Sequence, residues 1–325
     1  MGEFTVKKLE QKNIAQMTEL FSLAFNMHLK PEVVQWKYFD NPAGEAIWMG
    51  IFSVDKLVGS GAMVTEVLNV FGKSHTVYKC TDLMIHPAHQ GKGLASLINA
   101  ALREQVWELN PVFSYTLCSK NATSNFLKNG WINIGGLSNF FKPTLLLKAS
   151  HFINSKPNKN IRKFTSPDGL FENYAFKTDN TKINAAKSAK FMHWRTQNPN
   201  FSYFILGHFN HSEMDGYLIY SVGISGIFNL IDLEAVGDDK QVYKNLLKAL
   251  EIEAVQANCK GIVGICLESN SFYNILKSQR YLKNPFKKGP LLSTIDFNIL
   301  SKEKPSEALL NIHSWEVFGL LYDDV

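Results

Sequence analysis

The chain repeats itself once, in the same order, along its 325 residues. Four pairs of segments match: Trp36…Asn41-Pro42 with Trp194…Asn198-Pro199, Leu57–Ala62 with Asp215–Leu218, Thr81–Leu83 with Ile231–Leu233, and Asn125–Lys128 with Asn274–Lys277. Any one pair could arise by chance, but four pairs in one order at similar spacing favour two copies of one fold. The polar segment Ser150–Lys163 lacks apolar periodicity and is the expected boundary. It divides the chain into a first domain, 1–148, and a second, 149–325.

Composition narrows the class of protein. Apolar residues make up 45% of the chain and charged residues 19%, which is typical of globular domains. The net charge of +5 comes from dispersed lysines, so we expect no nucleic-acid partner. No apolar run approaches the ~18 residues of a membrane span, and the first residues do not resemble a signal peptide. We therefore expect a cytoplasmic protein without a membrane partner. The scattered cysteines predict free thiols, and we expect no metal: Cys80, Cys118, Cys259 and Cys266.

The first copy has the periodicity of alternating helices and strands. Apolar residues recur at helical spacing after Asn13 and again from Leu94. Between these helices a meander of strands is expected, over Ala46–Ser53, Leu57–Val70 and a third segment that ends near His86. Val112–Cys118 predicts a further strand and Ala122–Asn129 a short helix. The fold class is therefore mixed α/β: two tandem domains, each a mostly antiparallel mixed sheet flanked by helices.

The stretch DLMIHPAHQGKGLA, from Asp82 to Ala95, joins an apolar strand to a helix. The first turn of a helix has unpaired N–H groups and a partial positive charge, so it attracts anions. Gly91 and Gly93 let an anion approach the backbone, Ala95 stays small, and Lys92 adds charge. A tight turn without a ligand is the alternative. The spacing fits neither the P-loop nor the dinucleotide-binding pattern.

Leu83-Met84-Ile85-His86-Pro87 followed by Gln90-Gly91-Lys92-Gly93-Leu94-Ala95 resembles the signature of the GNAT superfamily of acyl-CoA-dependent N-acyltransferases. The resemblance covers most of residues 1–148. It implies that the loop amides hold the pyrophosphate of acetyl-CoA or another acyl-CoA, and that a β-bulge opens a cleft for the thioester. The implied cofactor-binding residues are Leu83, Met84, Ile85, Gln90, Gly91, Lys92, Gly93, Leu94, Ala95, Ser96 and Asn121. The implied reaction is direct transfer of an acetyl group to a primary amine of a small molecule or peptide.

Candidates for the proton transfers of this reaction are few. Asp82, on the strand that would flank the cofactor, is the candidate general base, with a structural hydrogen-bonding role as the alternative. The family often places a tyrosine general acid where this chain has Phe126, so water, Tyr115 or an N–H dipole would have to serve. Cys118 could be a nucleophile or a packing residue.

The two histidines beside the loop and the last residues of the chain each allow a catalytic and a structural interpretation. His86 and His89 flank the loop, where a surface or capping role competes with catalysis. The segment His313–Val325 alternates like a strand and ends in Asp323-Asp324, which offers a second candidate base or a frayed tail.

The second copy places Asp238-Asp239 where the first has its glycine loop, and carboxylates there would repel phosphates. We expect it to complete the substrate pocket or to support the first copy. A CoA-sensing module and a tRNA-dependent aminoacyl transferase remain alternatives, and the amine acceptor and the oligomeric state stay open.

Overall fold

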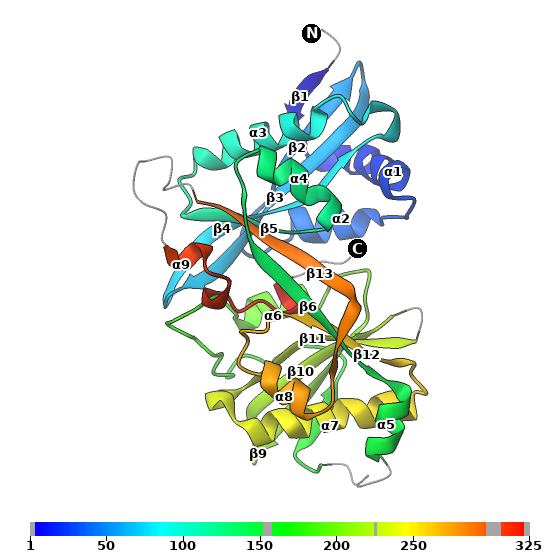
Figure 1. Ribbon diagram of the computed structural model, residues 1–325, viewed down its shortest axis with the longest axis vertical. Coiled ribbons are helices and arrows are strands. Elements are labelled where there is room, and N and C mark those ends of the chain that lie inside the picture. The colour runs from blue at the N-terminus through cyan, green and yellow to red at the C-terminus, as the bar shows by residue number, and fades with distance from the viewer. Residues whose placement is uncertain (1–3, 152–157, 224–225, 297–306, 322–325) are drawn as a thin grey trace.

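The computed structural model describes residues 4–151, 158–223, 226–296 and 307–321. The chain folds into two lobes that are joined by two long strands (Figure 1). Within the described residues, no helix is long and apolar enough to cross a membrane.

The first lobe is built on an antiparallel meander with one parallel strand beside it. Its strands are β1 (Thr5–Lys8), β2 (Ile47–Ser53), β3 (Lys56–Val70), β4 (Lys73–Ile85) and β5 (Phe113–Cys118), of which β5 runs parallel to β4. One face of this sheet packs against α3 (Leu94–Trp107) and α4 (Lys120–Lys128). The other face packs against α1 (Ile14–Phe25) and α2 (Pro31–Tyr38). Because both faces are covered, the strands carry apolar residues on both sides.

The second lobe repeats this order of elements. Its strands are β7 (Ile161–Phe164), β9 (Tyr203–Asn210), β10 (Glu213–Val222), β11 (Ile227–Ala235) and β12 (Gly261–Cys266), of which β12 runs parallel to β11. Its helices are α5 (Thr144–His151), α6 (Ala189–Arg195), α7 (Lys240–Gln256) and α8 (Tyr273–Ser278). The strand meander, long helix, parallel strand and short helix of the first lobe therefore all recur.

The two lobes share one continuous sheet. Strand β6 (Ile132–Pro143) follows the first lobe but pairs with β12, and β13 (Leu282–Asp296) follows the second lobe but pairs with β5. The strands β6 and β13 also pair with each other, so the order across the junction is β5-β13-β6-β12 (Figure 1). The predicted mixed α/β class is confirmed, and the exchange of strands was not predicted.

The last described segment packs between the lobes. It consists of α9 (Glu307–Leu310) and two short 3₁₀ turns, Ile312–Ser314 and Gly319–Leu321. Trp315 is fully buried there, against Phe113 and Tyr115 of β5. The strand expected for this segment is wrong for its described part, where only isolated bridges form, at Trp315 and Phe318. Asp323 and Asp324 lie outside the described residues.

Candidate active site

A β-bulge opens the first lobe between β4 and β5. The two strands pair only at Tyr78 with Ser114 and at Lys79 with Tyr115. Further along β4, the register with β3 shifts, and Asp82 adopts a left-handed conformation with φ of 52°. An extra residue of this kind bends a strand away from its neighbour. The bulge therefore confirms the splayed strand that the resemblance implied.

A cavity of about 290 Å³ lies where the strands diverge. It is lined from β4 by Lys79, Cys80, Thr81, Asp82 and Leu83, from β5 and the following turn by Thr116, Leu117, Cys118 and Ser119, from α4 by Ala122 and Phe126, and from elsewhere by Phe21, Phe25, Met27 and Leu321. We call it the bulge cavity. The segment between the lobes also contributes to this cavity, through Leu321.

Asp82 is anchored in this cavity through one carboxylate oxygen. Its Oδ2 accepts hydrogen bonds from Lys37 Nζ at 3.0 Å and from Tyr38 Oη at 2.7 Å. Both donors come from α2, and the Lys37 side chain is only 4% exposed. No described residue donates to Asp82 Oδ1. The carboxylate thus combines a structural ion pair with one oxygen that is available to a ligand.

Lys79 is a buried charged residue in the lining of the bulge cavity. Its Nζ lies 3.1 Å from Glu66 Oε1 and donates to the backbone carbonyl of Leu321 at 3.1 Å. Tyr115 also donates to Glu66, is fully buried, and does not line the cavity. Tyr115, a candidate general acid from the sequence, is therefore not exposed to the cavity.

Burial keeps the thiols of the bulge cavity protonated. Burial raises the pKa of Cys118, whose Sγ lies 3.5 Å from Thr123 Oγ1, and burial also raises the pKa of Cys80. A thiolate is the nucleophilic form of cysteine, so these positions favour packing over nucleophilic catalysis. Phe126 packs edge-on against Trp131 and offers no proton.

A second cavity, of about 260 Å³, lies at the glycine loop next along β4. Gly91 and Gly93 both have φ of 78°, and a Cβ added to either would meet nothing within 4 Å. Gly93 is the N-cap of α3, and no side chain caps this helix. Its first amides are therefore left to an external acceptor. The loop itself is tied down by Gln90, whose Nε2 donates to the carbonyl of Ile85 at 3.2 Å.

Most of the predicted cofactor-binding residues surround these two cavities. Leu83 lines the bulge cavity, and the loop cavity is lined by Ile85, Gln90, Gly91, Gly93, Leu94, Ala95 and Ser96. Three predicted residues lie elsewhere. Met84 is buried on the opposite face of the sheet. Lys92 Nζ lies over the Phe4 ring, 5.6 Å from its centre. Asn121 is exposed and lines neither cavity.

Asn125 is a site residue that the sequence interpretation missed. It lines the loop cavity, its Oδ1 accepts from Ser96 Oγ at 3.1 Å, and its Nδ2 is buried without a partner in the described residues. Asn125 lies one helical turn after Asn121 on α4, and it recurs as Asn274 in the second copy. Helical spacing from Asn121 was the signal that could have identified it.

The two histidines beside the loop differ in role. His86 caps a short 3₁₀ turn (Pro87–His89) by accepting from the backbone N–H of Ala88 at 3.1 Å. His89 lines the loop cavity, and its Nδ1 is buried without a partner in the described residues. A buried polar atom of this kind is expected to find a partner when a ligand is present.

The corresponding region of the second lobe is filled by the protein itself. Asp239 caps α7 by accepting from the N–H groups of Gln241 and Val242, and Asp238 accepts from Tyr243 Oη. At the position of Asp82, Asp232 contacts Lys187 Nζ at 2.7 Å and Tyr217 Oη at 2.6 Å. Only about 50 Å³ remains open there, and its lining includes Phe318 and Leu320.

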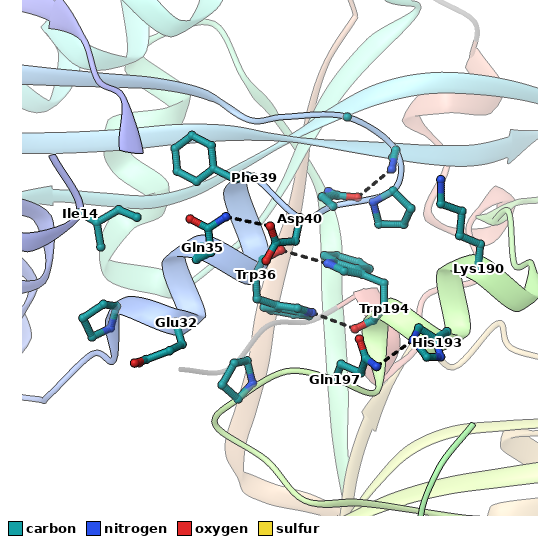
Figure 2. A pocket seen from close by; sticks show the side chains of 16 residues that line it. Ile14, Glu32, Gln35, Trp36, Phe39, Asp40, Lys190, His193, Trp194 and Gln197 are labelled. Carbon is teal, nitrogen blue, oxygen red and sulfur yellow. Dashed lines mark hydrogen bonds between the residues drawn. The ribbon is translucent and has the colours of Figure 1, made fainter. Parts of the chain in front are cut away.

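A larger cavity, of about 950 Å³, lies elsewhere, between α2 and α6 (Figure 2). Trp36 and Trp194 are stacked in its wall, with Lys190 and His193 beside them. It shares no lining residue with the bulge cavity or the loop cavity. The size of a cavity therefore does not identify the candidate active site. The bulge in β4 and the uncapped start of α3 identify it instead.

Comparisons with known proteins agree with this geometry. Residues 5–119 match the family model described as an acetyltransferase (GNAT) domain. No curated protein matches the chain in sequence.

Three solved structures illustrate the similarity in fold. A probable N-acyltransferase of unknown function from Enterococcus faecalis V583 is 12% identical with a TM-score of 0.67, over 91% of this chain and 73% of that one. A GCN5-related N-acetyltransferase from Anabaena variabilis is 13% identical with a TM-score of 0.63, over 91% and 73%. A tandem GNAT protein from the clavulanic acid biosynthesis pathway is 11% identical with a TM-score of 0.64, over 91% and 99%.

At these identities the structural neighbours establish the fold, whereas the sequence match establishes the family of the first lobe. That lobe contains the bulge, the glycine loop and the uncapped helix. The chain thus carries a GNAT acetyltransferase domain at residues 5–119, within the fold of a tandem GNAT protein, and is an acyltransferase.

Proposed function

We propose that the chain transfers an acetyl group from acetyl-CoA to a primary amine of a small molecule or peptide, by direct attack in a ternary complex. The observation that carries this proposal is the loop cavity. Two left-handed glycines there leave the uncapped start of α3 open, directly beside the bulge cavity. A pyrophosphate is the kind of anion that such a helix start binds.

The residues around the loop cavity fit an acyl-CoA. The amides of Gln90–Ala95 would hold the pyrophosphate, and Leu83–Ile85 would flank the pantetheine arm. Ser96 and Asn125 also line this cavity, and Nδ2 of Asn125 has no partner among the described residues. In this proposal residues 1–148 supply the cofactor site. Residues 149–325 complete the pocket, and their loop is disfavoured for phosphate because Asp239 already caps α7.

Acetyl-CoA supplies an activated thioester, and the chain supplies position and a proton acceptor. Asp82 Oδ1 would take a proton from the incoming ammonium group, while Lys37 and Tyr38 hold Oδ2 in place. The neutral amine nitrogen then forms a bond to the carbonyl carbon as the bond from carbon to sulfur breaks, and the acylated nitrogen releases its remaining surplus proton to water. The departing thiolate takes its proton from water, because Phe126 has none to give.

A matched pair of glycine substitutions tests the cofactor site. Gly93 and Gly237 occupy corresponding loops, have φ of 78° and 65°, and both leave space for a Cβ. Gly93→Val and Gly237→Val should therefore introduce similar backbone strain. We expect Gly93→Val to abolish acetyl-CoA binding in titration calorimetry and Gly237→Val to retain it. Equal affinity of the wild-type and Gly93→Val proteins would refute the assignment.

A non-catalytic CoA-binding role is the second candidate, and Phe126 favours it because it removes the family's usual proton donor. A thiol-release assay with a panel of amines separates the two functions. Release of CoA with any amine supports transfer, whereas tight binding of acetyl-CoA without release supports sensing.

A further inference from the structure

We infer that the acceptor is a primary amine on an apolar body, such as an arylalkylamine or alkylamine, without an anionic group near its nitrogen. This inference rests on the proposed function, because it names the substrate class of the same site.

The bulge cavity is much larger than the acyl group requires. Its volume is about 290 Å³, whereas one water molecule occupies about 30 Å³ of liquid. An acetyl group has only three non-hydrogen atoms, and the end of the pantetheine arm would enter beside Leu83, so the part of the cavity at Phe21, Phe25 and Met27 is left for another molecule. The amine must reach the thioester, so its body is the natural occupant of the remainder.

Large apolar side chains form one part of the wall of the bulge cavity. Phe21, Phe25 and Met27 line it from the end of α1 and the following loop, and Leu83 and Phe126 line it from β4 and α4. Phe25 is 46% exposed and Met27 is 50% exposed. Large apolar side chains that surround an opening to solvent favour a ligand that covers them. Their exposure also means that this part of the cavity is reached directly from solvent, as an acceptor requires.

The charged groups of this site favour a cation and disfavour an anion. The ammonium of Lys79 is paired with Glu66, and the ammonium of Lys37 is paired with Asp82. A carboxylate or phosphate beside the acceptor nitrogen would meet apolar walls and these neutralised pairs, at a desolvation cost. Asp82 Oδ1 accepts no hydrogen bond from the described residues, so it can receive one from an ammonium group.

Two matched pairs of amines test the substrate class with acetyl-CoA as the donor. Phenylalanine adds a carboxylate to 2-phenylethylamine, and 1,6-diaminohexane adds a second ammonium to hexylamine. We expect kcat/KM, measured by CoA release, to be at least tenfold higher for the apolar member of each pair. Equal or higher values for the charged members would overturn the inference while leaving N-acyl transfer intact.

A failure of the proposed acyl transfer can be distinguished from a failure of this inference about the acceptor. No release with any amine, despite binding of acetyl-CoA, would refute transfer itself. A preference for hexanoyl-CoA over acetyl-CoA, with no effect of the amine's body, would assign the cavity to the acyl chain and so overturn the inference.

Two substitutions on α1 test whether the apolar body of the amine binds in the bulge cavity. Phe25 lines the bulge cavity, whereas Leu23 is 49% exposed on the same helix and does not line it. Phe25→Ser should raise the KM for 2-phenylethylamine about tenfold without changing the Kd for acetyl-CoA, and Leu23→Ser should change neither. The inference is wrong if both variants behave alike, or if Phe25→Ser leaves the KM unchanged.

Discussion

Trp36 and Trp194 are bound to each other by a reciprocal pair of hydrogen bonds. Trp36 Nε1 donates to the carbonyl of Trp194 at 2.8 Å, and Trp194 Nε1 donates to the carbonyl of Trp36 at 3.0 Å (Figure 2). Their ring centres lie 4.7 Å apart, and the planes are inclined by 16°. The two matching tryptophans of the repeat are thus in direct contact. The carbonyl group of each one accepts the hydrogen bond of the other's indole N–H.

The residue that follows each tryptophan reaches toward the active site. Lys37 binds Asp82 in the bulge cavity, and Arg195 Nε donates to the carbonyl of Leu320 at 2.9 Å. Leu320 precedes Leu321, which lines the bulge cavity. The tryptophan pair therefore joins two helices, of which α2 contacts Asp82 in that cavity and α6 contacts Leu320 beside it.

We expect Trp36→Ala and Trp194→Ala each to lower the free energy of unfolding by about 3–5 kcal/mol. The double variant should lose much less than the sum, since each single change already removes the shared contact. Urea unfolding measures both quantities, with Leu145→Ala as a control because Leu145 is largely exposed. Additive losses would show that the two rings do not act as a unit.

Asp82→Asn should lower kcat by about 10²-fold, which is the lower end of what a general base contributes. It should also destabilise the fold, because it removes the negative charge of Asp82 from its ion pair with the buried Lys37. Asp232→Asn is the matched control, since Asp232 has the same kinds of partner in Lys187 and Tyr217. If both variants lose equal stability and equal kcat, Asp82 is a structural residue only.

Cys118→Ala should retain kcat to within about twofold. Burial raises the pKa of Cys118, so the thiol is not ionised at neutral pH and is a poor nucleophile. Mass spectrometry of the wild-type protein with acetyl-CoA alone should detect no acetyl adduct. An adduct on Cys118, or a loss of kcat in the variant with intact cofactor binding, would instead indicate a covalent intermediate.

Glu316 should make stability depend on pH. Burial raises its pKa above 4.5, against the opposing effect of Lys177 and Lys187. The folded state therefore binds this proton more tightly than the unfolded chain does. The resulting stabilisation is fully present below about pH 4.5 and is lost as the pH rises through the raised pKa.

Glu316→Gln cannot titrate, so its stability relative to wild type should increase as the pH rises from 4.5 toward 7.5. Urea unfolding at several pH values measures this difference. Glu19→Gln, an exposed substitution on α1, should run parallel to wild type. A constant difference between Glu316→Gln and wild type across this range contradicts the expectation.

Local patterns in the sequence predicted the parts of the site that lie close together along the chain. The strand, the glycine loop and the helix from Leu83 to Ser96 follow from periodicity and from glycines with positive φ. The repeat was also readable, because matching segments recur in order. These features depend on neighbours that are a few residues apart.

Contacts between distant segments were not predictable in this way. The pairing of β13 with β5 joins residues such as Thr294 and Tyr115, and an alternating pattern does not specify its partner strand. The ion pair of Asp82 with Lys37 likewise depends on how α2 crosses the sheet. No pattern around either residue in the sequence indicates this pairing, because only the fold brings the two side chains together.

The pairing of β5 with β13 has a consequence for synthesis of the chain. The ribosome makes β5 long before β13, and until residue 296 has emerged the edge of β5 that β13 will occupy carries unpaired N–H and C=O groups. The nascent first lobe can form its helices and meander early, but closing its sheet must wait for almost the entire chain. A fragment that ends at residue 148 would keep this open edge permanently. It should therefore aggregate or capture a strand from another molecule, and adding the β13 segment as a separate peptide should restore its solubility.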